Sequence, residues 1–334
     1  MKQHLDNISI IRGLSVLVVV AFHAYGMMYA HFDDVTNKVY STIYEHFNSS
    51  VLICIAMPMF VFVSGYLFQY LLDLGKYPTW KELLVKKAQR ILLPFLVFSW
   101  IFMATTGNWH PLNPIIQGSY WHLWFLPMLF WCFLIYYAFH RSGLINKQWF
   151  TIPVFFIFLL LVSAPKFIPM YFGLHNIHKW FFWFYLGGTI CLYKDLITTS
   201  FSKYHIHILL IIAYILYAYI DLCEYGEDTW YSTVGNASLI VVIWYLSTLV
   251  DWAKLKVSKL IITFSTYSYG IYIFHNWVEL HLLSNTSKKI FHLDVLAANH
   301  TILFPLCFFL VALFVSWALT KLLLMTKFGK FLIG

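Results

Sequence analysis

Two ionisable residues, Arg12 and His23, lie within one apolar stretch that runs from Ile8 to Tyr29. An ionisable side chain in a membrane-spanning helix is costly to bury, so each of the two is a candidate for a functional role. At 3.6 residues per turn, the second residue returns to within about 20° of the first and lies roughly 16 Å further along the axis. We therefore expect one helix face to present a cation near one end and an imidazole near the other.

A second pair of cations, Lys87 and Arg90, opens a later apolar stretch. The two residues are three positions apart, so on an α-helix they share a face about one turn apart. Cationic side chains grouped in this way suit an anionic phosphate, and Arg12 is expected at the same depth. They also suit simple anchoring at a cytoplasmic boundary, where lysine and arginine accumulate. The residues alone fit both interpretations.

Further polar side chains lie inside apolar stretches. Ser268, Tyr272 and His275 are spaced by four and then three residues, so they line one stripe of a helix. Such a stripe either makes hydrogen bonds between helices or lines a cavity for a substrate. Ser64, which precedes a glycine in another stretch, is open to the same two interpretations.

An aromatic segment that contains His122 and Trp124 follows the connection 106–119, which has no charged residue. Tryptophan and tyrosine gather at membrane interfaces for their amphipathic character alone. His122 is therefore either an interfacial histidine with a satisfied hydrogen bond or a member of a site that handles a substrate.

The composition indicates a membrane protein with several spans. Of the 334 residues, 61% are hydrophobic and 11% are charged, and the mean hydropathy is +0.72. An apolar run of roughly 17 to 25 residues can cross a bilayer as a helix. We predict an all-α bundle of about ten transmembrane helices, at 8–30, 50–72, 87–105, 120–139, 150–164, 179–193, 204–220, 231–250, 260–283 and 301–325.

Lysine and arginine support this arrangement, because short cytoplasmic loops hold most of these residues in membrane proteins. With ten spans and both termini in the cytoplasm, most of the 22 basic residues fall on the cytoplasmic side. The five expected outside are Lys38, Lys166, Lys179, Lys288 and Lys289. The net charge of +8 is then a signal of topology, and we do not expect a nucleic acid partner.

The polar connections 31–49, 73–86 and 284–300 are too short to form a soluble core, so we expect a single membrane-embedded domain over residues 1–334. The apolar first segment is much longer than that of a signal peptide, so we expect it to stay in the mature protein. The five cysteines are scattered without metal-ligand spacing, and no metal site is predicted.

Five motifs occur in an order that resembles the membrane-bound acyltransferase-3 family, which includes many bacterial O-acetyltransferases. The first is Arg12 followed after ten residues by His23. The others are MFVFVSGYLF at 59–68, KAQRILLPF at 87–95, HLWFL at 122–126 and SYGIYIFH at 268–275. One departure is Lys87, where the family more often has arginine; lysine keeps the charge but loses bidentate phosphate geometry.

The resemblance implies an acyltransferase of the bacterial inner membrane that carries an acetyl or other short acyl group from cytosolic acyl-CoA to a glycan hydroxyl. Arg12, Lys87 and Arg90 would hold the phosphates of the donor. His23, with an ordinary pKa near 6.5, would act as the general base or, as a variant, carry the acyl group. Candidate groups for the substrate or the oxyanion are Ser64, His122, Trp124, Ser268, Tyr272 and His275.

Two other classes of function are compatible with these residues. A transporter or flippase would use the same ionisable residues as a proton or substrate path, although no inverted repeat is present. A sterol- or lipid-sensing protein would not need Arg12 and His23 once it is inserted. The acyl group, the acceptor and the oligomeric state, a homodimer included, cannot be read from these residues.

Overall fold

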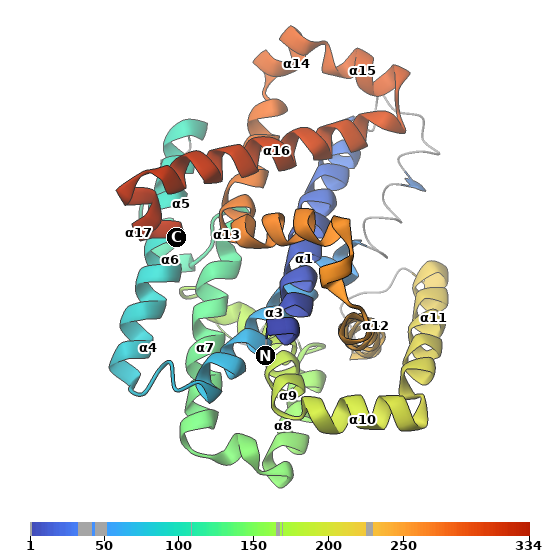
Figure 1. The fold of residues 1–334 in the computed structure, drawn as a ribbon. Helices are drawn as coiled ribbons and strands as arrows, with labels where there is room; N and C mark the ends of the chain where they lie inside the picture. The colour runs from blue at the N-terminus through green and yellow to red at the C-terminus, as the bar shows by residue number, and fades with distance from the viewer. Residues whose placement is uncertain are drawn as a thin grey trace. The chain divides into compact units, whose positions relative to one another are not determined.

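The computed structural model describes residues 2–32, 42–43, 52–107, 109–164, 168, 170–224 and 230–334, and their regular structure is entirely helical (Figure 1). This confirms the predicted all-α class. Parts of the predicted 31–49 connection and of the 50–72 segment lie outside the described residues, as do Lys38 and Lys166. The α-helices are α1 (Lys2–Phe32), α3 (Ile53–Asp73), α4 (Trp80–Lys87), α5 (Leu93–Thr106), α6 (Asn113–Gln117), α7 (Phe125–Arg141), α8 (Gln148–Leu161), α9 (Ile177–Leu192), α10 (Lys194–Tyr204), α11 (Ile206–Glu224), α12 (Trp230–Leu249), α13 (Lys256–Leu282), α14 (Asn285–Phe291), α15 (Leu293–Asn299), α16 (Leu303–Met325) and α17 (Lys327–Ile333). Short 3₁₀ or π turns are η2 (Ala88–Leu92), η3 (Trp121–Trp124), η4 (Leu144–Asn146), η5 (Leu174–Asn176) and η6 (Trp252–Lys254).

Six helices in the described residues are long and apolar enough to cross a membrane, so the predicted count of ten is not confirmed. They are Asp6–Met27, Ile55–Asp73, Trp80–Thr106, Trp121–Arg141, Trp230–Leu249 and Leu303–Met325. A seventh is gained if α10 and α11, which meet at 86°, count as one broken span. The bend falls at His205, whose φ of 51° is left-handed and interrupts the helix.

The other predicted spans are helical but differ from the spanning pattern for physical reasons. The helices α8 and α9, with 14 and 16 residues, are shorter than the roughly 20 residues that a bilayer requires. Helix α13 has 27 residues, but polar and ionisable residues interrupt its apolar sequence.

Two compact units divide the chain. Unit 1 consists of residues 1–57 and 247–334, and unit 2 consists of residues 58–246. The boundaries fall within α3 and α12.

In unit 1, α1 packs along α13, and both helices pack against α16 (Figure 1). The close approach depends on Gly13, because a Cβ atom at this position would overlap the carbonyl oxygen of Ile261 on α13. Buried aliphatic residues of α1, such as Val16, Val19 and Val20, complete the packing. This contact brings the face of α1 that carries Arg12 and His23 against α13.

In unit 2, α3 and α9 make a similar close contact. A Cβ atom on Gly65 of α3 would overlap the carbonyl oxygen of Phe184 on α9. Around this contact, Phe68 and Phe133 meet edge to face at 4.7 Å, and Phe133 and Phe184 do so at 5.1 Å. Aromatic pairs in this geometry add stability beyond their buried area, so they hold α3, α7 and α9 together.

Candidate active site

Arg12 lies on α1, where its Nε atom donates a hydrogen bond to Ser265 Oγ on α13 at 2.9 Å. Among the residues that the structure describes, Arg12 has no carboxylate partner. The residue lies inside the candidate span Asp6–Met27, where an uncompensated cation is costly. The guanidinium has further N–H donors beyond Nε, so it can still bind an anion such as a phosphate.

His23, on the same helix, meets His275 on α13. The His23 Nδ1 and His275 Nε2 atoms are 3.2 Å apart, and the two rings cross at 69° with centroids 4.8 Å apart. Arg12 and His23 therefore both contact α13, which agrees with the shared face expected from their spacing. His275 is fully buried.

Backbone carbonyls indicate which nitrogens of this pair carry protons, because a carbonyl oxygen only accepts hydrogen bonds. His275 Nδ1 lies 2.7 Å from the Tyr272 oxygen, so Nδ1 is protonated and Nε2 of the neutral ring is an acceptor. His23 Nδ1 lies 2.9 Å from the Val19 oxygen and 3.2 Å from His275 Nε2. Because both of these atoms are acceptors, His23 Nδ1 carries the proton and donates. The neutral His23 ring thus has its lone pair on Nε2, which is the nitrogen able to take a proton.

Ser268 and Tyr272 lie between Ser265 and His275 along α13. Their side chains are 4% and 1% exposed. The Tyr272 ring lies 5.8 Å from the His275 ring. The predicted stripe is thus buried within protein, as expected for polar residues in a membrane helix.

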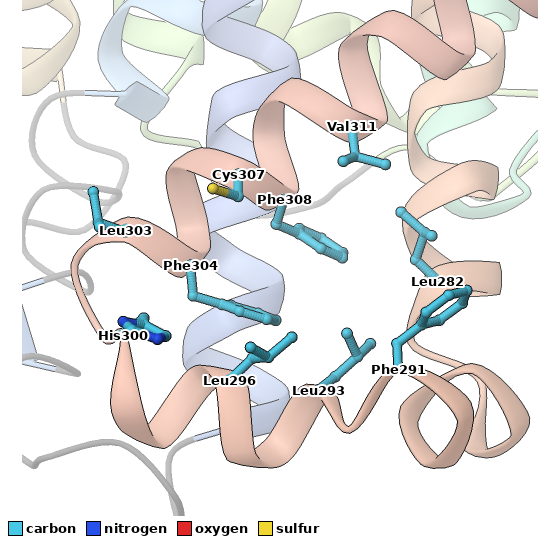
Figure 2. A pocket seen from close by; sticks show the side chains of 10 residues that line it. All are labelled: Leu282, Phe291, Leu293, Leu296, His300, Leu303, Phe304, Cys307, Phe308 and Val311. Atoms are coloured by element: carbon cyan, nitrogen blue, oxygen red, sulfur yellow. The ribbon is translucent and has the colours of Figure 1, made fainter.

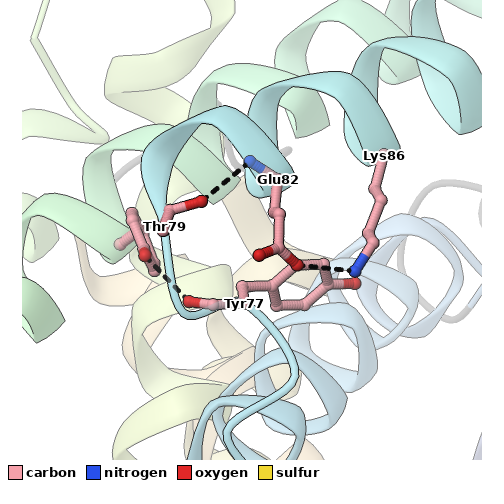
Figure 3. Close-up of polar contacts among 5 residues, drawn as sticks. Tyr77, Thr79, Glu82 and Lys86 are labelled. Atoms are coloured by element: carbon pink, nitrogen blue, oxygen red, sulfur yellow. Dashed lines mark hydrogen bonds and ion pairs between the residues drawn. The ribbon is translucent and has the colours of Figure 1, made fainter.

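Lys87 and Arg90 belong to unit 2, at the junction of α4 and η2. The start of α4 is fixed by Thr79, whose Oγ1 accepts a hydrogen bond from the Glu82 amide at 3.2 Å. Glu82 also pairs with Lys86 at 3.1 Å, one helical turn later (Figure 3). This is a helix N-cap followed by a pair at i and i+4, two local features that favour α4.

The two cations of this pair occupy different surroundings. Lys87 is enclosed by aromatic rings: its Nζ atom lies 3.4 Å from the centroid of Phe133, 5.0 Å from that of Phe68 and 5.3 Å from that of Tyr77. Arg90 is exposed. Because η2 is a π-helical turn, with hydrogen bonds from i to i+5, a spacing of three residues no longer gives the shared α-helical face that was expected.

The other predicted site residues of unit 2 lie on α3 and η3. Ser64 donates its hydroxyl to the Phe60 carbonyl at 2.9 Å, a bond within its own helix. His122 is 6% exposed and stacks on Phe102 with ring centroids 6.4 Å apart. Trp124 packs against Trp180 at 5.2 Å. The predicted site residues are therefore divided between the two units.

A residue that sequence reasoning did not single out is Glu279 on α13. Its side chain is fully buried, and neither carboxyl oxygen has a hydrogen-bond partner among the described residues. It lies one turn beyond His275, on the same helix face. The available signal was a carboxylate inside a predicted span, which by itself marks a functional candidate. The described residues contain no group of three or more side chains suited to hold a metal ion.

A family model for an acyltransferase domain matches residues 5–321, which is nearly the whole chain and includes every residue of the candidate site. The chain belongs to the acyltransferase-3 family. As an acyltransferase-3 protein with several apolar helices, it is a multi-pass membrane acyltransferase. Comparisons with curated proteins and with solved structures find no match.

Proposed function

We propose that this acyltransferase moves an acetyl or other short acyl group from cytosolic acyl-CoA to a hydroxyl group at the bacterial inner membrane. The proposed acceptor is a cell-surface or cell-wall glycan or its lipid-linked precursor. The observation that carries the proposal is the His23–His275 pair, which leaves His23 Nε2 as the basic nitrogen. This nitrogen belongs to the same α1 helix as the cation of Arg12.

His23 acts as the general base in this reaction. Its Nε2 takes the proton of the acceptor hydroxyl while the hydroxyl oxygen attacks the thioester carbonyl carbon. The new C–O bond forms, the C–S bond breaks, and His23 returns the proton to the leaving thiolate. The products are the acyl ester and free CoA thiol, and His23 is regenerated without a covalent intermediate.

His275 acts on His23 as a positioning residue. Its Nε2 accepts the hydrogen bond of His23 Nδ1, which keeps the base in one tautomer and one orientation. When His23 becomes an imidazolium, the same hydrogen bond stabilises the added charge, because it then joins a cation to a neutral acceptor. The buried position of His275 strengthens this effect by excluding water.

Of the three cations, Arg12 is the strongest candidate to bind the donor phosphates, because it has no carboxylate partner among the described residues. Lys87 and Arg90 are proposed to contribute to the same function. Of the two, Arg90 is the more exposed to solvent, whereas the Lys87 ammonium is surrounded by aromatic rings. Ser268 and Tyr272 are the proposed oxyanion or orienting groups nearest to His275, and Ser64, His122 and Trp124 are proposed for the acceptor.

The experiment is thiol release from acetyl-CoA by the purified protein in nanodiscs with a panel of glycan acceptors. We expect His23→Gln to lower the rate by about 10²–10⁴-fold, the usual contribution of a positioned base. His281→Gln is the matched control, because His281 Nδ1 also bonds to the carbonyl four residues earlier, at 2.8 Å. Arg12→Gln is expected to raise the KM for the donor.

Two results would reject the proposal. If the wild-type protein neither binds acyl-CoA nor releases thiol with any acceptor, the proposed donor is wrong. If His23→Gln and His281→Gln retain equal activity, His23 is not the base.

A further inference from the structure

Unit 1 contains a cavity of about 550 Å³ between α14, α15 and the adjoining ends of α13 and α16 (Figure 2). Figure 2 shows Phe304 and Phe308 pointing from α16 towards Leu293 and Leu296 on α15. All lining residues are apolar except His300. Such a lining binds hydrocarbon and offers little to a polar ligand.

Local sequence explains why the cavity stays open. Ser284 caps α14 by accepting a hydrogen bond from the Ser287 amide at 3.3 Å, and His292 then adopts a left-handed φ of 47° that separates α14 from α15. The two helices have seven residues each and form an arch between α13 and α16 (Figure 1). Phe304 and Phe308 stack at 6.2 Å and form one wall beneath the arch.

The cavity borders a surface suited to contact with lipid. Helix α16 is a candidate membrane span, and its cavity-lining residues Leu303 and Val311 are 58% and 43% exposed. Phe291, at the other side of the cavity, is 58% exposed. Apolar side chains exposed on a spanning helix contact the hydrocarbon of the bilayer, so a lipid chain can reach the cavity from there.

Positive charge lies beside this apolar space. Lys288 precedes Phe291 by three residues, so the two share a face of α14, and Lys289 is exposed next to it. The only acidic residue between positions 284 and 300 is Asp294. A lysine ammonium is a suitable point charge for a phosphate.

We propose that the cavity binds one hydrocarbon chain of a phosphate-bearing lipid, with the phosphate held near Lys288 and Lys289. The volume lies within the range of about 300–1,000 Å³ that is usual for small-molecule sites. On the expected topology the site faces the outer leaflet. The lipid site does not depend on the proposed acyl donor or acceptor, because the lipid binds without acyl transfer.

Cys307 lines the cavity and is exposed, so its reactivity reports occupancy. The full-length protein is purified in a sterol-based detergent that has no alkyl chain, and alkylation of Cys307 by a maleimide is followed by peptide mass spectrometry. The probes are oleoyl lysophosphatidic acid, monoolein with the same chain but no phosphate, and glycerol 3-phosphate with no chain. Bound lysophosphatidic acid is counted separately by native mass spectrometry.

We expect lysophosphatidic acid to slow alkylation of Cys307 at least fivefold, monoolein less, and glycerol 3-phosphate not at all. Val311→Phe fills the cavity and should abolish lipid retention. Val315→Phe is the matched control, because Val315 lies one turn further on α16, is 40% exposed and does not line the cavity. Lys289→Gln should reduce the advantage of lysophosphatidic acid over monoolein.

The proposal is overturned if lysophosphatidic acid fails to protect Cys307 in the wild-type protein. Equal protection by monoolein would overturn the assignment to a phosphate-bearing lipid. Equal lipid retention by the two valine variants would place the lipid elsewhere. If Val311→Phe does not fold, the wild-type series and the surface variant Lys289→Gln still decide the outcome.

Discussion

His23 and His275 form a pair in which two backbone carbonyls determine the direction of the hydrogen bond between the rings. His275 Nδ1 donates to the Tyr272 carbonyl and His275 Nε2 accepts from His23 Nδ1, so the basic nitrogen of His23 is Nε2, which lies on the other side of its ring. A histidine orienting a second histidine is chemically analogous to a carboxylate orienting a catalytic histidine, but it adds no negative charge. Its effect should therefore be on orientation and on the stability of the imidazolium.

We expect His275→Leu to lower kcat for acyl transfer while leaving the donor KM nearly unchanged, because Leu cannot accept the hydrogen bond of His23 Nδ1. The loss should be smaller than the roughly 10²–10⁴-fold expected when the base itself is removed. His275→Gln should restore part of the rate, since a Gln carbonyl oxygen can occupy a position close to that of Nε2. Steady-state kinetics of thiol release measure both effects. Equal rates for the Leu and Gln variants would show that His275 contributes only packing.

Glu279 is a buried carboxyl group on α13 that has no hydrogen-bond partner among the described residues. An ionised carboxylate buried without a partner costs several kcal/mol, so we expect this side chain to be held as the neutral acid. Glu279→Met keeps a similar unbranched shape and removes the two unsatisfied oxygens. We expect this variant to raise the free energy of unfolding by about 1–3 kcal/mol. Thermal unfolding in detergent measures the change.

Glu82→Gln is the control for Glu279→Met, because it removes a carboxylate that pairs with Lys86 on the surface, and such pairs contribute about 0–1 kcal/mol. A lower stability for Glu279→Met would indicate that Glu279 is paired with an ion or a ligand in the membrane. Loss of acyl transfer with raised stability would instead identify Glu279 as a functional group that is retained at a cost to stability.

At the level of helices, the sequence predicted that Arg12 and His23 share one face of α1, but it did not identify their contacts on α13. The spacing of Arg12 and His23 follows from helix geometry, whereas the contacts with Ser265 and His275 depend on how α1 and α13 pack. The π-helical turn η2 was not predictable, because α-helical periodicity describes only the commonest hydrogen-bond pattern. A carboxylate inside a predicted span was the signal for Glu279, but its complete burial depends on helix packing, which the sequence does not specify.

The contact between α1 and α13 leads to a prediction about Gly13. A Cβ atom there would overlap a backbone oxygen of Ile261, which cannot move without shifting α13. We expect Gly13→Ala to lower the free energy of unfolding by about 1–3 kcal/mol, the usual cost of overpacking. It should also reduce acyl transfer, because the His23–His275 and Arg12–Ser265 contacts both require this approach.

Val18→Ala is the control for Gly13→Ala, because it also places an alanine on α1, at a half-buried position, but removes atoms instead of adding them. We expect it to leave acyl transfer close to that of the wild-type protein. Unfolding midpoints and thiol release are measured for both variants. If Gly13→Ala matches the wild-type protein in both measurements, α1 and α13 do not approach as closely as the structure indicates.

For the whole molecule, the path of α13 through the membrane determines which sides of the bilayer the candidate site can reach. Its 27 residues span about 40 Å, which exceeds the roughly 30 Å of a hydrocarbon core. Its polar stripe keeps it outside the group of clearly apolar helices. Because α1 and α16 pack against it, this stripe can be shielded from lipid inside unit 1.

We therefore expect the two ends of α13 to lie on opposite sides of the membrane. Lys259, near the start of α13, should face the cytoplasm, and Lys289, beyond its end, should face outwards, as the distribution of basic residues predicts. In Lys289→Cys, an impermeant maleimide should label the new cysteine in intact cells. In Lys259→Cys, it should do so only after permeabilisation, and peptide mass spectrometry locates each label. Labelling of both positions from the same side would mean that α13 re-enters, so that His23 and Arg12 could not connect a cytosolic donor to an outer acceptor along this helix pair.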